Sequence, residues 1–290
     1  MKKNVFLLIG VMAALSACEK NFVEVDDSAM YEDDEHRVMT FSVEGDFGSA
    51  GFTRGALSAD GKAMTDLWVL DYVDGQLVQQ KHQTADDEDF GEPTMALEYG
   101  SHHVYFIASR GEGATLSTSG HKISWTKVLD TFWKDYNVNV TSATSASQNV
   151  TLGRVATKLQ VAINDEIPEG TATVELTPAT WYYGLDYMSG EACDPLPSET
   201  RIINIPSSYI GTTGRVTASI YGISNAAEWT TNVSVTARDG DDDVLGQVSI
   251  AGAPFKANRV TSYAGSLFSS GGDFSITLND TWSDAYNGEW

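Results

Sequence analysis

Basic side chains are scarce in this chain: 18 Lys and Arg stand against 40 Asp and Glu, and the formal net charge is −22. Binding to the phosphates of nucleic acid needs clustered Lys and Arg, so the composition argues against a DNA or RNA partner. Only 2 cysteines are present, Cys18 and Cys193, which are too few for a disulfide framework or for a zinc site built on thiolates. Stability must therefore come from packing.

Signatures of catalysis and of cofactor binding are also missing. The chain has no Gly-x-Ser-x-Gly, no Gly-x-x-x-x-Gly-Lys-Ser/Thr, no Gly-x-Gly-x-x-Gly opening a helix and no His-Glu-x-x-His. His102 and His103 are neighbours on a predicted strand, so their side chains point to opposite faces and do not readily hold one ion together. We expect no enzyme, no cofactor and no resident metal, although the many acids leave a glycosidase-like pair of carboxylates open.

The densest group of oxygen ligands is the run Asp239-Gly240-Asp241-Asp242-Asp243. An EF-hand loop needs Gly at position six and Glu at position twelve, but counting from Asp239 these positions hold Val244 and Ile250, which excludes that motif. The run favours a solvated hairpin tip, and metal binding by it stays an open alternative.

The amino end has the pattern of an exported protein. Lys2 and Lys3 precede an apolar run, residues 5–15, that is too short to span a bilayer as a stable helix, and this predicts a signal peptide over residues 1–17. The sequence Leu15-Ser16-Ala17-Cys18 resembles the lipobox of bacterial lipoproteins, with Cys18 as the acylated residue. Several acyl chains would anchor the protein in the outer membrane, at the cell surface. An ordinary secretory signal with a chance cysteine is the alternative.

Residues 18–36 are acidic and contain few apolar side chains. Such a segment cannot bury enough surface to fold alone, so we expect a tether here. Within it, Asp27-Ser28-Ala29 resembles the O-glycosylation pattern of the Bacteroidetes, which makes Ser28 a candidate site. A chance match in an acidic linker is the alternative.

The remainder of the chain predicts a mainly β protein. Short segments rich in β-branched and aromatic residues recur between turn formers, and 26 Gly against 7 Pro suits many tight connections. Leu159, Val161 and Ile163 alternate with Lys158, Gln160 and Ala162, as in an antiparallel sheet with one buried face. Asp74-Gly75 predicts a type I′ hairpin turn. The predicted strands are residues 38–43, 67–72, 103–108, 148–152, 158–163, 173–176, 201–205, 216–220, 233–237, 244–250, 260–268 and 274–278.

One short amphipathic helix is expected from residue 124 onward, because apolar side chains recur at spacings of three and four. They are Trp125, Val128, Leu129, Phe132, Trp133 and Tyr136. Such a stripe favours packing against the core over a sugar-stacking surface. The length of the folded part exceeds what one hydrophobic core holds, so we expect two β-sandwich domains, residues 37–150 and 151–290.

Trp181, Tyr182 and Tyr183 form an aromatic triplet in a chain with 7 Trp and 12 Tyr. Aromatic faces stack on sugars, so the triplet is a candidate glycan contact. Packing within a sheet is the alternative, because alternate side chains of a strand already bury one face.

Several segments stand in a characteristic order along the chain. They are Met-Thr-Phe-Ser-Val at 39–43, Thr53-Arg54-Gly55, Thr-Asp-Leu-Trp-Val-Leu-Asp-Tyr at 65–72, Asp-Thr-Phe-Trp at 130–133, Val-Thr-Leu-Gly-Arg-Val-Ala-Thr-Lys-Leu at 150–159, Asn-Arg-Val-Thr at 258–261 and Phe-Ser-Ile-Thr-Leu-Asn-Asp-Thr-Trp at 274–282. In order and spacing they resemble the fimbrillin-like proteins of Bacteroides and Porphyromonas relatives, the group that contains the major subunits, tips and anchors of type V pili.

The resemblance implies two tandem transthyretin-like β-sandwich domains and export as a lipoprotein precursor. In the pilins of this group an arginine-specific protease cuts the precursor and frees a groove, which a strand of another fimbrial subunit fills. The resemblance makes Arg54 the first candidate for this cut and Arg37 the second, whereas anchor subunits keep their lipid and stay uncut.

We therefore expect a fimbrial component or anchor that acts in cell adhesion. Its partners would be other fimbrial subunits, the outer membrane and a host or bacterial surface ligand, and the choice among shaft, tip and anchor stays open. The alternative function is a surface lipoprotein that binds glycans through exposed aromatic side chains.

Overall fold

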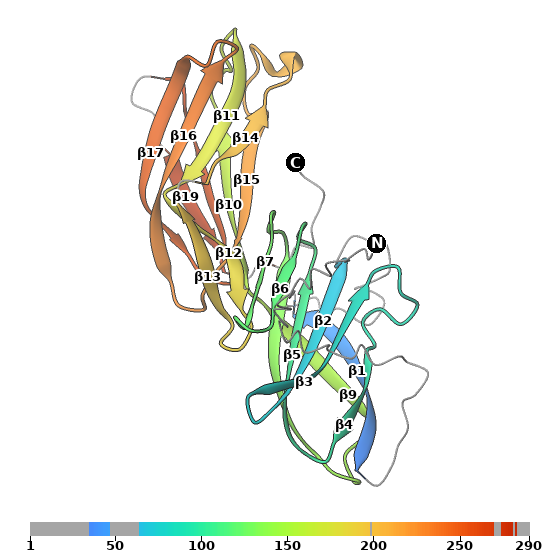
Figure 1. Cartoon of the computed structure of the whole chain (residues 1–290). Coiled ribbons are helices and arrows are strands. Elements are labelled where there is room, and N and C mark those ends of the chain that lie inside the picture. The colour runs from blue at the N-terminus through green and yellow to red at the C-terminus, as the bar shows by residue number, and fades with distance from the viewer. Residues whose placement is uncertain (1–34, 47–63, 198, 270–273, 281, 283–290) are drawn as a thin grey trace, which may run out of the picture.

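The computed structural model describes residues 35–46, 64–197, 199–269, 274–280 and 282. Within these ranges the chain forms nineteen strands and one 3-10 turn, Ser207–Tyr209, but no α-helix. The mainly β fold is confirmed, and every segment predicted as a strand overlaps one. Figure 1 shows an elongated molecule, with the first half of the chain in blue to green at one end and the second half in yellow to red at the other.

A seven-stranded sheet organises the first half of the chain, in the order β3-β2-β5-β8-β9-β1-β4. Its strands are β1 (His36–Asp46), β2 (Asp66–Val73), β3 (Gln76–Thr84), β4 (Thr94–Glu98), β5 (Gly100–Ser109), β8 (Thr131–Val140) and β9 (Ser147–Arg154). Strands β8 and β9 share only two residue pairs, Phe132 with Arg154 and Trp133 with Gly153. The strands on either side of this short junction enclose one apolar core, in which the rings of Phe41 on β1 and Phe106 on β5 lie 5.2 Å apart.

The turn between β2 and β3 follows the prediction. Asp74 and Gly75 occupy the two central positions with φ angles of 49° and 75°. A type I′ turn requires positive φ at both positions, which Asp tolerates and Gly adopts freely because it lacks a Cβ atom. The predicted hairpin is therefore confirmed.

Two four-stranded sheets face each other in the second half of the chain, with the orders β15-β10-β18-β19 and β14-β11-β16-β17. Their strands are β10 (Ala156–Ile163), β11 (Thr171–Pro178), β14 (Arg201–Asn204), β15 (Val216–Ile223), β16 (Trp229–Asp239), β17 (Val244–Phe255), β18 (Val260–Gly265) and β19 (Phe274–Asn279). Leu159, Val161 and Ile163 of β10 are fully buried between the sheets, as their alternation predicted. Val174 and Val235 belong to the same core from the opposite sheet.

A third four-stranded sheet joins the two halves of the chain. Its order is β13-β12-β7-β6, with β6 (Thr115–Ser117), β7 (Lys122–Ser124), β12 (Thr180–Asp186) and β13 (Glu191–Pro197). Strands β6 and β7 come from the first half, and β7 pairs with β12 of the second half from Ser124–Gly184 to Lys122–Asp186. The halves are therefore linked by backbone hydrogen bonds as well as by the chain.

The outer face of β2 and β5 is also buried, because it packs against this joining sheet. Leu70 and Tyr72 on β2 and Ile107 on β5 belong to the same apolar cluster as the core of the second half. The hydroxyl groups of Tyr72 and Tyr187 lie 2.8 Å apart, in hydrogen-bond contact across the junction. One continuous apolar core thus runs from the first half into the second.

The helix predicted from residue 124 onward is wrong. Residues 125–130 connect β7 to β8, and β8 pairs with β5 along its whole length. Trp125, Val128 and Leu129 belong to the core that spans the junction, whereas Phe132 belongs to the core of the first half. The stripe therefore serves two separate cores and not one helix face, which the spacing alone did not reveal. No helix of the described residues is long and apolar enough to cross a membrane.

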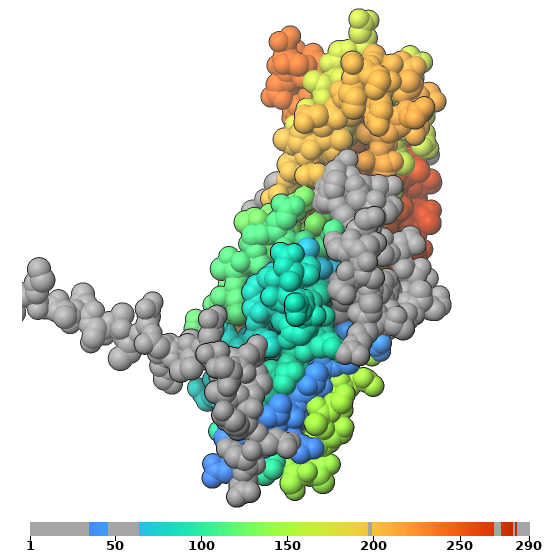
Figure 2. Space-filling model, turned by 90° about the vertical axis from the view of Figure 1, so that its right-hand side faces the viewer, coloured from blue at the N-terminus to red at the C-terminus, as the bar shows by residue number. Residues whose placement is uncertain are grey.

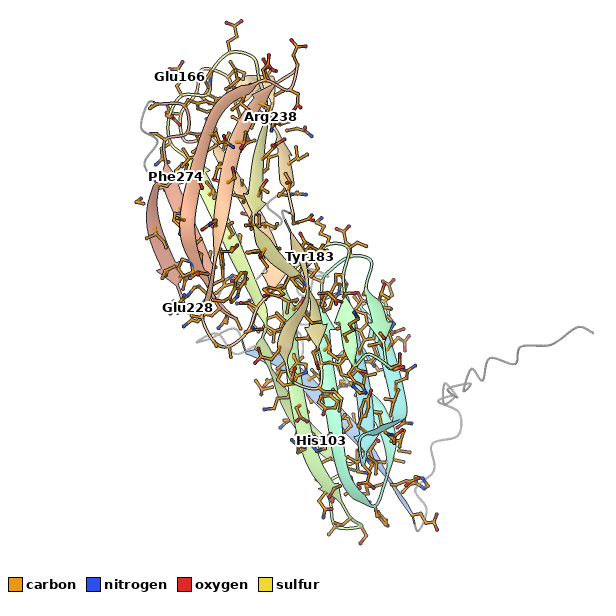
Figure 3. All side chains as sticks on the ribbon, turned by 60° about the vertical axis from the view of Figure 1, so that its left-hand side comes forward. His103, Glu166, Tyr183, Glu228, Arg238 and Phe274 are labelled. Atoms are coloured by element: carbon orange, nitrogen blue, oxygen red, sulfur yellow. The ribbon has the colours of Figure 1, made fainter. Side chains whose placement is uncertain are left out.

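A buried histidine joins three strands of the first half. His102 on β5 donates through Nδ1 to the Asp71 carboxylate of β2 at 2.8 Å and through Nε2 to the backbone oxygen of Glu98 on β4, also at 2.8 Å. Both partners are hydrogen-bond acceptors, a carboxylate and a backbone carbonyl, which favours the imidazolium form with a proton on each ring nitrogen. Burial alone would lower the pKa of His102, but the hydrogen bond and the charge of Asp71, together with the contacts to Glu98, outweigh burial jointly, and the pKa is raised. His103, by contrast, is exposed (Figure 3).

The His102 contact predicts a pH-dependent stability. A raised pKa means that the folded state holds the proton more tightly than the unfolded chain, so the stabilisation is full below about pH 6.5 and is lost as the pH rises through the folded pKa. We expect His102→Gln to lower the melting temperature most at acidic pH, with a difference from the unmodified protein that shrinks toward pH 9. His103→Gln is the matched control, for which we expect a small, flat difference. A His102→Gln difference independent of pH would contradict the assignment.

Candidate functional site

Three of the predicted site residues, Cys18, Ser28 and Arg54, lie outside the described residues. The second candidate for cleavage, Arg37, lies in β1, where it is paired with Leu97 of β4. Its side chain is half-buried, and its Nε donates to the backbone oxygen of Thr144 at 3.0 Å. A protease needs an extended, accessible segment, so a cut at Arg37 requires β1 to leave the sheet first.

Strand β1 occupies an interior position in its sheet. It pairs antiparallel with β4 over residues 36–40 and parallel with β9 over residues 40–46. On its inner face Met39, Phe41 and Val43 are almost completely buried. Removal of β1 would leave unpaired backbone groups on both neighbours and an open apolar groove between them.

The aromatic triplet does not form an exposed platform. Trp181 on β12 is 0% exposed, and its indole Nε1 donates to the backbone oxygen of Tyr221 at 2.9 Å. Tyr183 is also buried and lies where the two halves meet (Figure 3), whereas Tyr182 is half-buried against the edge of Trp229. A sugar cannot reach the face of Trp181, so the triplet as a whole is not a glycan contact surface. The structure corrects that expectation, because strand alternation directs these side chains into two different environments.

The acidic run 239–243 forms the tip of the hairpin between β16 and β17. One carboxylate oxygen of Asp239 accepts the backbone N–H groups of Asp241 and Asp243, both at 2.9 Å, and Asp242 has a positive φ of 72°. Arg238 donates to the backbone oxygen of Asp242. The carboxylates thus shape a tight turn. Within the described part of the chain, no three His, Cys, Asp or Glu side chains are placed to hold a metal ion.

The characteristic segments converge on one buried site between the halves of the molecule. Arg154, the last residue of β9, binds the carboxylate of Asp130 in a bidentate pair with distances of 2.7 and 3.0 Å, and both side chains are nearly inaccessible. The same guanidinium donates to the side-chain oxygen of Asn258 at 3.1 Å and to the backbone oxygen of Trp282. It also stacks 4.0 Å above the Trp282 ring and 4.9 Å from the Phe132 ring. We call this group the junction cluster.

A second arginine repeats the arrangement beside the junction cluster. Arg259 forms a two-pronged pair with the Asp280 carboxylate and a further ion pair with Glu228, and Lys256 binds Asp280 at 2.9 Å. The hydrogen bonds from Arg259 and Lys256 lower the pKa of the Asp280 carboxyl to about 2. Burial raises the pKa of the Asp130 carboxyl, and the charge of Arg154 opposes that rise.

The sequence contained these residues but did not show that they meet. Asp130 and Trp282 are far apart in the chain, and only a folded structure brings both to Arg154. The available signal was a chemical repeat: Asp-Thr-Phe-Trp at 130–133 matches Asp-Thr-Trp at 280–282, and Arg154-Val155 matches Arg259-Val260. In both repeats the Asp pairs with the Arg.

Comparisons with known proteins place the fold. No known family profile and no curated protein sequence matches the chain. Among solved structures, a candidate adhesin from Bacteroides thetaiotaomicron aligns with a TM-score of 0.53 and 11% identity, over 86% of this chain and 97% of that one. A candidate adhesin from Bacteroides ovatus gives 0.52 and 11%, over 91% and 98%. A candidate polysaccharide-binding protein from Bacteroides thetaiotaomicron gives 0.51 and 10%, over 87% and 99%. The chain therefore has the fold of these proteins along almost their whole length.

The junction cluster predicts a large cost for separating its charges. Asp130→Ala leaves the buried Arg154 guanidinium without its counter-charge, so we expect the free energy of unfolding to fall by about 3–5 kcal/mol in urea titrations. The double variant Asp130→Leu/Arg154→Met removes both charges, and we expect it to lose less than the single variant. Glu112→Ala breaks the exposed pair with Lys127 and serves as the control, at less than about 1 kcal/mol. Equal losses in Asp130→Ala and Glu112→Ala would contradict the structural role of the pair.

Proposed function

We propose that this chain is a cell-surface component of a fimbria, as subunit, tip or anchor, and that it acts in cell adhesion. The observation that carries the proposal is the fold, which follows two candidate adhesins over 97% and 98% of their lengths. The ordered fimbrillin-like segments add to it, because those at residues 130–133, 150–159, 258–261 and 274–282 supply the side chains of the junction cluster and of the neighbouring Arg259 group. Segments that share one packing role are expected to persist together in proteins of one architecture.

We further propose that the chain folds as two tandem transthyretin-like sandwiches, residues 37–150 and 151–290. The bent seven-stranded sheet would form the first sandwich, and the two facing four-stranded sheets would form the second. The joining sheet and the last residues of β9 would then be the contact between the domains. We propose no enzymatic activity for either domain.

The amino-terminal segment would deliver the protein to the outer membrane. After removal of residues 1–17, acylation of Cys18 would anchor the chain, the acidic residues 18–36 would act as a tether, and Ser28 would be the candidate site for a glycan. In an anchor subunit this lipid remains, whereas in a shaft subunit it is lost when the tether is cut away.

Assembly by strand addition would use the position of β1. Arg54 falls in the sequence between the end of β1 at Asp46 and the start of β2 at Asp66. A cut there would make β1 a separate piece, held only by noncovalent contacts, so that another strand with apolar residues in place of Met39, Phe41 and Val43 could replace it. The interior position of β1 supports this proposal, because its loss exposes an apolar groove and two strand edges at once.

Glycan binding remains the second candidate function, favoured by the likeness of fold to a candidate polysaccharide-binding protein. Trp181 is buried, so a binding surface would have to use other residues.

Acylation is tested by metabolic labelling of the source cells with radioactive palmitate. We expect the label in the unmodified protein and in Cys193→Ala, and its loss in Cys18→Ala, because only the residue that follows the signal peptide can receive the lipid. Fractionation should show the labelled protein in the outer membrane and accessible to protease on intact cells. Labelled Cys18→Ala, or a protein confined to the periplasm, would contradict the proposal.

Processing is tested by limited digestion with an arginine-specific protease, using Lys variants that keep the charge but remove the cleavage site. We expect a product that begins at Gly55 from the unmodified protein and from Arg37→Lys, and no such product from Arg54→Lys. A cut at Arg37 should be at least about tenfold slower, because β1 must first open. A product beginning at Val38 formed at the same rate would contradict this view, and fibres that form only after the cut would identify a shaft subunit.

A further inference from the structure

A cavity of about 420 Å³ lies where the two halves of the chain meet. Figure 1 and Figure 2 show the two halves end to end. The cavity lining comes from β8 and β9 of the first half and from three turns of the second half, which follow β12, β15 and β17. The volume is within the range of small-molecule sites, about 300–1,000 Å³. We call it the Trp133 cavity, after the largest side chain that borders it.

Trp133 on β8 is held in place from two sides. Its indole Nε1 donates to the backbone oxygen of Tyr187 at 2.7 Å. Gly190 packs against the six-membered ring: a Cβ atom at this position would lie 2.6, 2.8 and 2.9 Å from three consecutive ring atoms, which places it above the face of the ring and not at the edge. A larger residue at position 190 would therefore displace the ring. A ring that is fixed before binding loses little entropy when a ligand arrives.

The neighbouring strand leaves the ring of Trp133 accessible. Gly153 on β9 is the residue directly opposite Trp133 in the short β8–β9 pairing. Directly opposite residues of an antiparallel pair carry their side chains on the same face, so any side chain at position 153 would lie beside the indole. Trp133 is only half-buried, and both residues border the cavity. Part of the indole is therefore accessible from the cavity, unlike Trp181, which is fully buried.

The polar side chains around the cavity provide both donors and acceptors. Lys134 and Glu191 are exposed, border the cavity and form no ion pair with the described residues. The hydroxyl oxygen of Ser189 accepts the backbone N–H of Glu191 at 3.3 Å, which leaves its own proton to be donated to a second partner. Thr151 donates to the Glu44 carboxylate at 2.8 Å, so its oxygen can still accept a hydrogen bond.

Arg154 also borders the cavity but is not available to a ligand. It is 4% exposed, and its guanidinium is bonded to Asp130, to Asn258 and to the backbone oxygen of Trp282. Its charge is balanced by Asp130 within the junction cluster. The accessible rim of the cavity thus carries one cation, Lys134, and one carboxylate, Glu191, which favours a ligand without net charge.

A sugar fits this combination for two reasons. Each sugar hydroxyl group both donates and accepts a hydrogen bond, and the C–H groups on one face of a pyranose ring pack well on an aromatic ring. From the fixed indole and the mixed donors and acceptors around it, we propose that the Trp133 cavity binds a neutral sugar unit of an oligosaccharide. The inference rests on the second candidate function, glycan binding, to which it gives residues, and it does not require the chain to be part of a fimbria.

The test is isothermal titration of the full-length protein with three neutral, β-linked hexasaccharides, those of glucose, of mannose and of N-acetylglucosamine. We expect at least one of them to bind. Gly153→Leu is the sharpest variant, because a Cβ atom at this position would meet no atom closer than 4.0 Å and Gly153 does not have a positive φ angle. The fold should therefore accept the leucine, which would cover the indole. We expect Gly153→Leu and Trp133→Leu each to weaken binding by about tenfold or more.

The polar rim is tested by Lys134→Ala and Glu191→Ala. Each should weaken binding by about threefold to tenfold, because each removes a hydrogen bond to a sugar hydroxyl group. Glu169→Ala is the matched control, since it removes one exposed carboxylate that lies outside the cavity, and we expect it to bind like the unmodified protein. Lys134 and Glu191 are exposed, so their variants should keep the melting temperature of the parent and remain informative even if Trp133→Leu unfolds.

Two results would overturn the proposal. They are no binding of any of the three hexasaccharides, and binding that neither Gly153→Leu nor Glu191→Ala weakens, which would place the sugar elsewhere on the protein. Display on the cell surface and incorporation into fibres are measured separately, on the source cells. A protein absent from the surface would count against the proposed function, whereas a failed titration with normal display would count only against the Trp133 cavity.

Discussion

The buried pair of Asp130 and Arg154 is the contact on which the arrangement of the two halves depends. Asp130 directly precedes β8, and Arg154 stands at the change from β9 to β10, where the chain leaves one half for the other. The planar guanidinium accepts only a narrow range of carboxylate directions when it binds through two nitrogens. The pair therefore fixes the path of the chain at its crossing point, and Asn258 and Trp282 fasten the second half to the same group.

Burying two charges in the protein interior carries a large desolvation cost, and apolar residues of the same volume often give equal or greater stability. The advantage of the ion pair is that it fixes the relative direction of the two side chains. The aromatic ring of Trp282 covers the guanidinium, so water cannot replace the carboxylate, and the second pair of Arg259 and Asp280 holds the same chain end from the other side. We infer that the junction uses ionic geometry to select one relative orientation of the halves, and uses the continuous apolar core to stabilise it.

Local features of the fold could be predicted from the sequence, and long-range ones could not. The alternation of Leu159, Val161 and Ile163 and the turn at Asp74-Gly75 depend on neighbours in the chain, and both are confirmed. The expected helix is wrong because its apolar side chains serve two cores, a division that no local spacing contains. Trp181 looked available in the sequence because burial depends on β15 and β16, which arrive later in the chain. The junction cluster likewise exists only once distant strands have met.

The joining sheet ties the two halves of the molecule together. Interfaces between domains are usually small and allow motion unless they are large and apolar. Here, separating the halves would break the β7–β12 backbone pairs, part the hydroxyl groups of Tyr72 and Tyr187, and take Asn258 and Trp282 away from Arg154, so these contacts are lost together.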